Sequence, residues 1–301
     1  IYGQTDSGMT IIEGHLFLNG KKPIQQRSSY GLGEVIKAAL DNHTEHLVIS
    51  LGGIGSFDGG AGMLQALGAT FYDDEAQIVD MRKGADLIKY IRRIDLSGVH
   101  PQLAKVNIQL MSDFSSRLYG KKSEIMQTYE SLDLSQNEAA EIDNLIWYFS
   151  ELFKNELKIA MGPIERGGAG GGIAAVLNSL YQAEILTSHE LVNQITHLEN
   201  LIQQADLIIF GEGLKEEDQI LETTTIRIAE LTQQYNKPAI AICATNDKFD
   251  LFESLNVTAM FNTFIDMPDS YTDFKMGIQI RHYTVQALKL LKTQINLPLS
   301  S

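Results

Sequence analysis

Six glycines between residues 52 and 62 form the part of this sequence best suited to chemistry. They are Gly52, Gly53, Gly55, Gly59, Gly60 and Gly62, in the stretch HLVISLGGIGSFDGGAGMLQALGA at 46–69. Glycine permits positive φ and close approach to a ligand, and N–H groups at a helix start can face an anion. The stretch lacks the Lys-Ser/Thr ending of a Walker loop. It predicts a site for a phosphate or carboxylate, with a plain tight turn as the alternative.

A second glycine cluster precedes the helical pattern IAAVLNSLYQAEIL. It consists of Gly167, Gly168, Gly170, Gly171 and Gly172. A glycine-rich loop before a helix is again a candidate phosphate-binding loop. A flexible linker between helices is the alternative.

Polar residues, with a carboxylate in each group, follow three of the predicted strands. Asp113 ends KVNIQLMSD, Glu212 lies between two glycines at the end of ADLIIFGEG, and Thr245, Asn246 and Asp247 follow the run KPAIAICA. Ligands of open α/β sheets lie outside the carboxyl ends of the strands, so these positions are candidate site residues. The histidines are scattered singly and no Cys/His pair is present, which argues against a zinc site.

The elements that position these residues follow from hydrophobic periodicity. A strand at 47–51 and a helix that buries Met63, Leu64 and Leu67 flank the first glycine stretch, and residues 1–20 predict a hairpin. A helix is expected from about Ser28 or Ser29 onward, and a longer one over 135–159, whose apolar positions, Trp147 among them, we interpret as core. The last third alternates strands and helices, which indicates a parallel sheet.

Composition excludes several classes of protein. The 301 residues are 44% hydrophobic, enough for a sizeable core and about two domains. The net charge of −14 argues against nucleic acid or an anionic membrane surface as a partner. Cys243 excludes an intrachain disulfide, suits a reducing cytosol and is expected to be buried as a small hydrophobe. No apolar run approaches the roughly 20 residues of a membrane span, so we expect a cytoplasmic protein.

Several motifs together resemble the bacterial type I glycerate kinases. They are SSYGLGEVIKAALD, LGGIGSFDGGAGMLQALGA, IDLSGVHPQL, GGAGGGIAAVL, ADLIIFGEG and KPAIAICA, and DGGAGMLQALGA at 58–69 is the most specific of them. The resemblance implies an ATP- and Mg²⁺-dependent kinase that phosphorylates D-glycerate in a cleft between two α/β domains. It implies that Gly52, Gly53, Ser56, Asp58, Gly59 and Gly60 line the cleft, with Asp113, the glycines at 167–172 and Glu212 opposite.

The sequence also departs from that family. Ile54, Ser56 and Phe57 replace a Ser, a Thr and an Asn of the family motif, and Leu214 and Thr223 replace an arginine and a lysine. Such cations matter because phosphoryl transfer depends on charge neutralisation and positioning. The family's N-terminal APDSFK and ADGGEGT motifs are absent, and the chain starts at Ile1 rather than at a methionine, which indicates a fragment or a processed product.

Two functions therefore stay open. One is a divergent glycerate kinase, in which Asp58 or Asp113 orients or deprotonates the glycerate hydroxyl and Glu212 or the other aspartate holds Mg²⁺. The other is a degenerate relative that binds a small acid or a nucleotide in a regulatory role. Capping of the following helix is the alternative for Asp58. We expect a middle α/β domain at 1–195, a Rossmann-like part at 196–301 that lacks its N-terminal half, an uncovered edge or apolar face on that part, and possible self-association.

Overall fold

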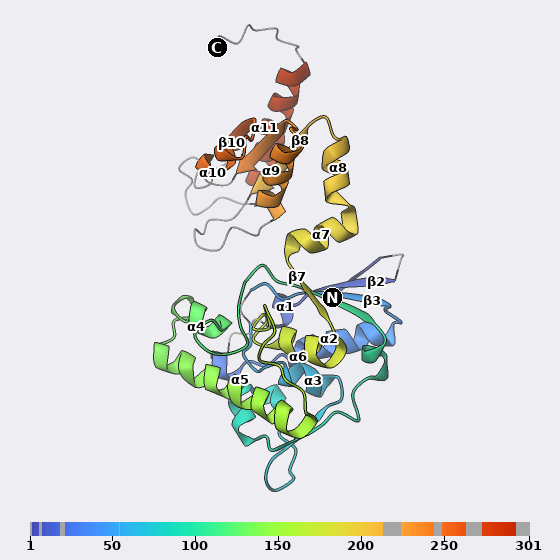
Figure 1. Cartoon of the computed structure of the whole chain (residues 1–301), viewed down its shortest axis with the longest axis vertical. Coiled ribbons are helices and arrows are strands. Elements are labelled where there is room, and N and C mark those ends of the chain that lie inside the picture. Colours follow the sequence, from blue (N-terminus) through green and yellow to red (C-terminus); the bar gives the residue numbers. More distant parts are fainter. Residues whose placement is uncertain are drawn as a thin grey trace. The chain divides into compact units, whose positions relative to one another are not determined.

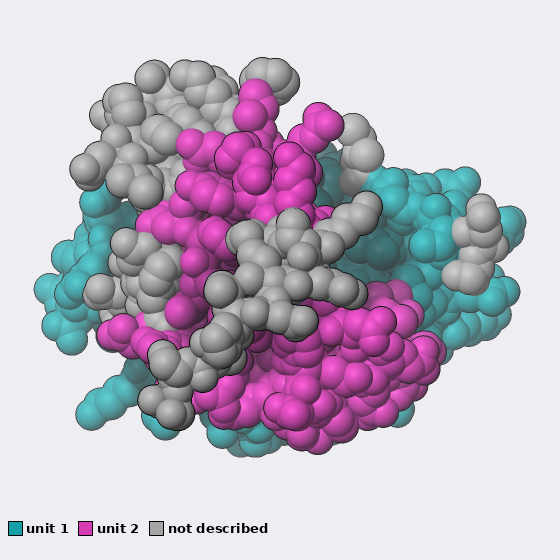
Figure 2. Space-filling model, turned by 90° about the horizontal axis from the view of Figure 1, so that it is seen from above, with its two compact units in different colours: residues 1–187 teal, residues 188–301 magenta. Residues whose placement is uncertain are grey.

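The computed structural model describes residues 2–5, 8–18, 22–53, 55–212, 224–243, 249–262 and 273–292. It divides into two compact units, Ile1–Thr187 and Ser188–Ser301, which Figure 2 shows in separate colours. The boundary predicted after residue 195 falls near the end of the first helix of the second unit, and the domain roles assigned to the two ranges stay predictions. The α/β fold class is confirmed, with a mostly parallel central sheet.

The first unit is built on a five-stranded sheet in the order β1-β2-β3-β6-β7 (Figure 1). Its strands are β1 (Gly3–Gln4), β2 (Met9–Glu13), β3 (His46–Ser50), β6 (Asn107–Met111) and β7 (Glu184–Leu186), with β4 (Thr70–Tyr72) and β5 (Arg93–Asp95) forming a separate antiparallel pair. β1 and β2 form the predicted hairpin, and the other pairs of the central sheet are parallel. Leu47, Val48 and Ile49 are all buried, because the sheet is covered on both faces.

Helices of the first unit pack on this sheet, on the β4–β5 pair and on one another. They are α1 (His15–Leu18), α2 (Tyr30–Asp41), α3 (Ala61–Ala66), α4 (Glu124–Thr128), α5 (Gln136–Leu157) and α6 (Ile173–Tyr181), and 3-10 turns lie at Ile24–Gln26, Met81–Lys83, Ala85–Tyr90, Pro101–Ala104 and Glu130–Leu132. α2 crosses α3 at Gly33, where a Cβ would lie only 2.4 Å from the carbonyl oxygen of Met63. Ser135 and Glu138 form a capping box that starts α5.

The apolar stripe of α5 is core, as predicted, but Trp147 is not part of it. Ile142, Ile146, Phe149 and Phe153 are buried, whereas Trp147 is 48% exposed. One residue beyond Ile146 is a turn of about 100° around the helix, which carries Trp147 off the buried face. The prediction that Trp147 belongs to the core was wrong for that reason.

The second unit contains a parallel three-stranded sheet in the order β10-β9-β8. Its elements are α7 (Ser188–Thr196), α8 (Leu198–Gln204), β8 (Ile208–Glu212), α9 (Thr224–Gln234), β9 (Ala239–Cys243), α10 (Phe249–Ser254), β10 (Ala259–Asn262) and α11 (Asp273–Lys292). All of β9 is buried, Cys243 included, as the sequence predicted. The parallel strands predicted for this part are confirmed. Ile209, Ile278 and Leu288 are among its exposed large hydrophobic residues.

Candidate functional site

The carboxyl edge of the five-stranded sheet gathers the strand ends of the first unit. Glu13, Ser50, Met111 and Leu186 are successive partners across the sheet, so they form one row. The segments that follow this row carry His15, the first glycines, and Asp113, which lies two residues beyond β6 and is half-buried. The predicted placement of Asp113 beyond a strand end is confirmed. Parallel strands expose their ligand-binding loops at this edge.

Gly52 and Gly53 are the exposed part of the first glycine loop. Gly53 has a φ of +89°, and a Cβ there would lie 3.2 Å from the Cβ of His15. The amides of Gly52 and Gly53 have no hydrogen-bond acceptor among the residues that the structure describes. They are therefore available to an anion at the carboxyl edge, with the His15 imidazole close by.

Asp58 lies in the buried part of the same loop and has no exposed surface. Its Oδ2 accepts hydrogen bonds from the Ser29 amide at 2.8 Å, the Ser29 hydroxyl at 2.9 Å and the Gly62 amide at 3.1 Å. Its Oδ1 accepts from the Gly60 amide at 3.1 Å. Burial raises the pKa of Asp58, and these hydrogen bonds oppose the rise. The carboxylate joins the start of α2 to the start of α3. It accepts from an amide in the first turn of α3, as the capping alternative predicted, but the N-cap position itself is Gly60.

The remaining amides of this half are also engaged within the chain. Gly59 donates to the carbonyl oxygen of Gly171 at 3.0 Å, Ala61 donates to that of Asp58, and Met63 donates to the Ser29 hydroxyl. An anion site at the start of α3 would need free amides from Gly59 to Gly62, and that expectation was wrong, because Asp58 and Gly171 accept all four. Whether Asp58, Gly59 or Gly60 serves a ligand stays a prediction.

The second glycine cluster is a packed element rather than a flexible linker. Gly167, Gly168, Gly170, Gly171 and Gly172 are all buried. A Cβ at Gly171 would lie 1.8 Å from the carbonyl oxygen of Ser56, and one at Gly168 would lie 2.3 Å from that of Arg117. The amides of Gly172, Ala174 and Ala175 donate to carbonyl oxygens of the same cluster. These glycines allow two loops to touch backbone to backbone, and their predicted phosphate contacts stay predictions.

Buried polar groups surround this loop contact. The side chain of Glu124 is buried. Its Oε2 accepts a hydrogen bond from the Gly171 amide at 3.1 Å. Burial raises the pKa of Glu124 to about 7, and that hydrogen bond opposes the rise. The hydroxyl groups of Ser56 and Ser116 are buried without a hydrogen-bond partner in the described part of the chain. Ser56, predicted to line the substrate cleft, is buried, and its contact with a substrate stays a prediction.

Two groups near the first loop were missed by sequence reasoning. Arg27 donates from Nη1 to the carbonyl oxygen of Gly55 at 3.3 Å and from Nε to that of Lys22 at 2.8 Å. His15 follows β2 at the carboxyl edge. Neither residue belongs to a motif, so only the tertiary fold associates them with the glycines.

Glu212 ends β8 in the second unit. Its strand partner is Cys243, which in turn pairs with Asn262, so the three positions form the row at the carboxyl edge of that sheet. Leu214, Thr223, Thr245, Asn246 and Asp247 lie outside the described residues. Within the described ranges, no group of three metal-ligating side chains is present. No helix in those ranges is long and apolar enough to cross a membrane.

A model of the glycerate kinase family matches residues 7–279, through both units. The chain belongs to the glycerate kinase family. It is 31% identical over 231 residues to a glycerate kinase of Halalkalibacterium halodurans, which covers 77% of this chain and 60% of that protein. It is 29% identical over 236 residues to the glycerate 2-kinase of Escherichia coli, which covers 78% of this chain and 61% of that one.

A solved structure shares the fold. The crystal structure of a Salmonella typhimurium LT2 protein assigned as glycerate kinase 2 is similar with a TM-score of 0.78 and 26% identity, and the match covers 98% of this chain and 79% of that one. The chain spans about 60% of the length of the curated family members it matches.

Proposed function

We propose that this chain carries the function of a glycerate kinase, the ATP-dependent phosphorylation of D-glycerate to phosphoglycerate. The observation that carries the proposal is the family match over residues 7–279, which spans both units. The two relatives with about 30% identity to this chain are named glycerate kinase and glycerate 2-kinase. The carboxyl edge of the first unit supports it, because outward amides and a carboxylate lie where a small hydroxy acid or a phosphate could bind.

In this proposal the exposed half of the glycine loop does the binding. The amides of Gly52 and Gly53 receive a carboxylate or phosphate oxygen, and Asp113 orients or deprotonates the reacting hydroxyl. Arg27 brings a positive charge to the same loop, where it offsets the charge of an anion. Asp58 acts by holding the loop and the two helix starts in place.

The carboxylates of Asp113 and Glu212 fit a nucleotide with Mg²⁺ by their chemistry. Mg²⁺ is usually held by one or two carboxylates together with waters and substrate phosphates, so Asp113 or Glu212 would suffice as protein ligands. The ion would neutralise phosphate charge during transfer. ATP, Mg²⁺, D-glycerate, a cytoplasmic location and self-association remain parts of the proposal.

The test is an assay of the whole chain with D-glycerate, Mg²⁺ and ATP. We expect calorimetry to detect D-glycerate or ATP binding, and we expect ADP release well below the usual kinase range of about 1–100 s⁻¹, because Leu214 and Thr223 replace the family's cations. Asp113→Asn should abolish the residual turnover, and Asp74→Asn, at an exposed position, should not.

Three outcomes separate the possibilities. Turnover within the usual range would show that other groups, Arg27 among them, replace the lost cations. Binding without turnover would favour the degenerate relative that acts as a small-acid or nucleotide-binding protein. No binding of either compound would overturn the proposal.

A further inference from the structure

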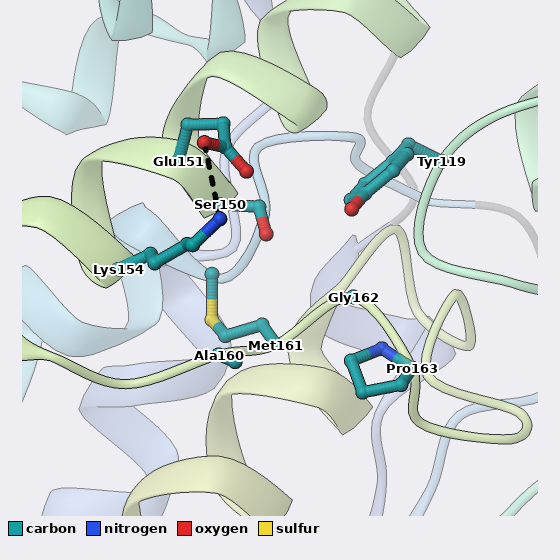
Figure 3. Close-up of a pocket in the computed structure, with 8 residues that line it drawn as sticks. All are labelled: Tyr119, Ser150, Glu151, Lys154, Ala160, Met161, Gly162 and Pro163. Atoms are coloured by element: carbon teal, nitrogen blue, oxygen red, sulfur yellow. Dashed lines mark ion pairs between the residues drawn. The ribbon is translucent and has the colours of Figure 1, made fainter.

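A pocket of about 400 Å³ lies between the C-terminal half of α5 and the segment 160–163 (Figure 3). That volume is within the usual range of about 300–1,000 Å³ for small-molecule sites. α5 contributes Ser150, Glu151 and Lys154 to one wall, and Met161 and Pro163 supply an apolar wall opposite. None of the residues at the carboxyl edge lines this pocket, so it is a separate feature of the first unit.

Two hydroxyl groups face the pocket and lack partners. Ser150 is only 3% exposed. Figure 3 shows the hydroxyl end of Tyr119 turned toward the side of the pocket on which Ser150 lies. Neither hydroxyl makes a hydrogen bond within the described part of the chain. Both hydroxyls can therefore donate to or accept from a polar atom of a molecule inside the cavity.

Gly162 makes room for the second of these hydroxyls. A Cβ at that position would lie 2.5 Å from the Tyr119 hydroxyl oxygen and 3.2 Å from its ring carbon. The glycine therefore lets the phenol reach the cavity.

The rim of the pocket presents two opposite charges. Lys154 Nζ and Glu151 Oε2 are 3.8 Å apart, and the two side chains are 60% and 34% exposed. This separation is longer than a hydrogen bond, so both groups keep capacity for another partner. A ligand with only a negative charge would be repelled by Glu151, and a ligand with only a positive charge would be repelled by Lys154. A zwitterion can satisfy the two charges together.

We propose that this pocket binds a free α-amino acid. Its carboxylate pairs with Lys154 and its ammonium group with Glu151, since these groups of an amino acid are as closely spaced as the two charges on the rim. The apolar part of its side chain lies on Met161 and Pro163. A polar atom of the ligand takes the hydrogen bonds of Ser150 and Tyr119. This binding goes beyond the proposed kinase function and does not depend on it.

The experiment is calorimetry on the whole chain with each of the twenty amino acids. We expect at least one to bind. The matching acid without its amino group, and the matching amine without its carboxylate, should each bind at least about tenfold more weakly. Ser150→Ala should weaken binding of the amino acid, whereas Glu156→Gln, at an exposed position of the same helix outside the pocket, should leave it unchanged.

The charge variants give the sharper result. Glu151→Gln should weaken binding of the amino acid and strengthen binding of the acid that lacks the amino group, because the repulsive carboxylate is gone. Lys154→Gln should weaken binding of both compounds. Circular dichroism checks that each variant keeps its helix content. Absence of binding by all twenty amino acids, or equal affinities in Lys154→Gln, Glu151→Gln and Glu156→Gln, would overturn the proposal.

Discussion

The two halves of the first glycine loop have similar sequences and opposite uses. Gly59, Gly60 and Gly62 direct their amides into the protein, where Gly171 and Asp58 accept them, while Gly52 and Gly53 are exposed with amides that no described residue accepts. Glycine serves the first group by permitting close backbone packing, and at the second group we propose that it leaves room for a ligand. A glycine-rich motif therefore indicates close approach but does not say what approaches.

The comparison extends to the acidic residues. Asp58 has four donors and no exposed surface, whereas Asp113 is half-buried beyond a strand end. A carboxylate with all of its acceptor capacity taken by the fold has little left for a substrate. We therefore assign the structural role to Asp58 and propose the chemical one for Asp113.

The largest effect is expected from Asp58→Ala. The change removes the acceptor of four donors, which are the Ser29 amide, the Ser29 hydroxyl, the Gly60 amide and the Gly62 amide. A buried unsatisfied donor costs about 1–3 kcal/mol. We expect the free energy of unfolding to fall by at least about 3 kcal/mol, measured by urea denaturation. Asp74→Ala, at an exposed carboxylate, should change it by less than about 0.5 kcal/mol. Equal stabilities of the two variants would contradict the structural role.

A smaller effect is expected from the pH dependence of the contact between the two loops. The folded-state pKa of Glu124 is raised from 4.5 to about 7 by burial, so the folded protein binds its proton more tightly than the unfolded chain. This contribution to stability is complete below about pH 4.5 and is lost as pH rises to about 7. The loss is on the order of 3 kcal/mol, and Asp58 shifts the dependence in the same direction.

Glu124→Gln tests this dependence. The amide side chain keeps an acceptor for the Gly171 N–H and cannot ionise, so the fall in stability between about pH 5 and pH 7.5 should become much shallower. Urea denaturation across that range measures it, and Glu156→Gln is the exposed control. A pH profile unchanged by Glu124→Gln would show that other groups dominate it.

Much of the fold could be predicted because the residues that form each helix or strand are neighbours in the sequence. The runs at β3, β6, β8 and β9 and the stripe of α5 are continuous in sequence, and hydrophobic periodicity reports them directly. Trp147 was misplaced because a helical stripe has a width that residue spacing alone does not define.

The candidate site was less predictable because its contacts are distant in sequence. Ser29 reaches Asp58, Gly171 reaches Gly59 and Arg27 reaches Gly55 only in the folded chain. The glycine spacing that predicted an anion site is equally compatible with two closely packed loops. The burial of Glu124 could not be predicted from the sequence, since an isolated glutamate at the start of a helix is usually exposed.

The smallest effect on stability, with a clear effect on binding, is expected from Gly52→Val. Gly52 does not have a positive φ, and the nearest atom to an added Cβ is the Ser50 hydroxyl oxygen at 4.0 Å, so the free energy of unfolding should change by less than about 0.5 kcal/mol. The new side chain blocks the close approach of an anion to the exposed amides, and calorimetry should show D-glycerate or ATP binding weakened by about tenfold or more. Gly60→Ala is the matched change in the buried half. Its φ of +77° should cost about 1–2 kcal/mol of stability and leave the affinity of the folded protein unchanged. If Gly60→Ala reduced affinity and Gly52→Val did not, the anion would bind at the buried half after all, which would require Asp58 and Gly171 to release its amides.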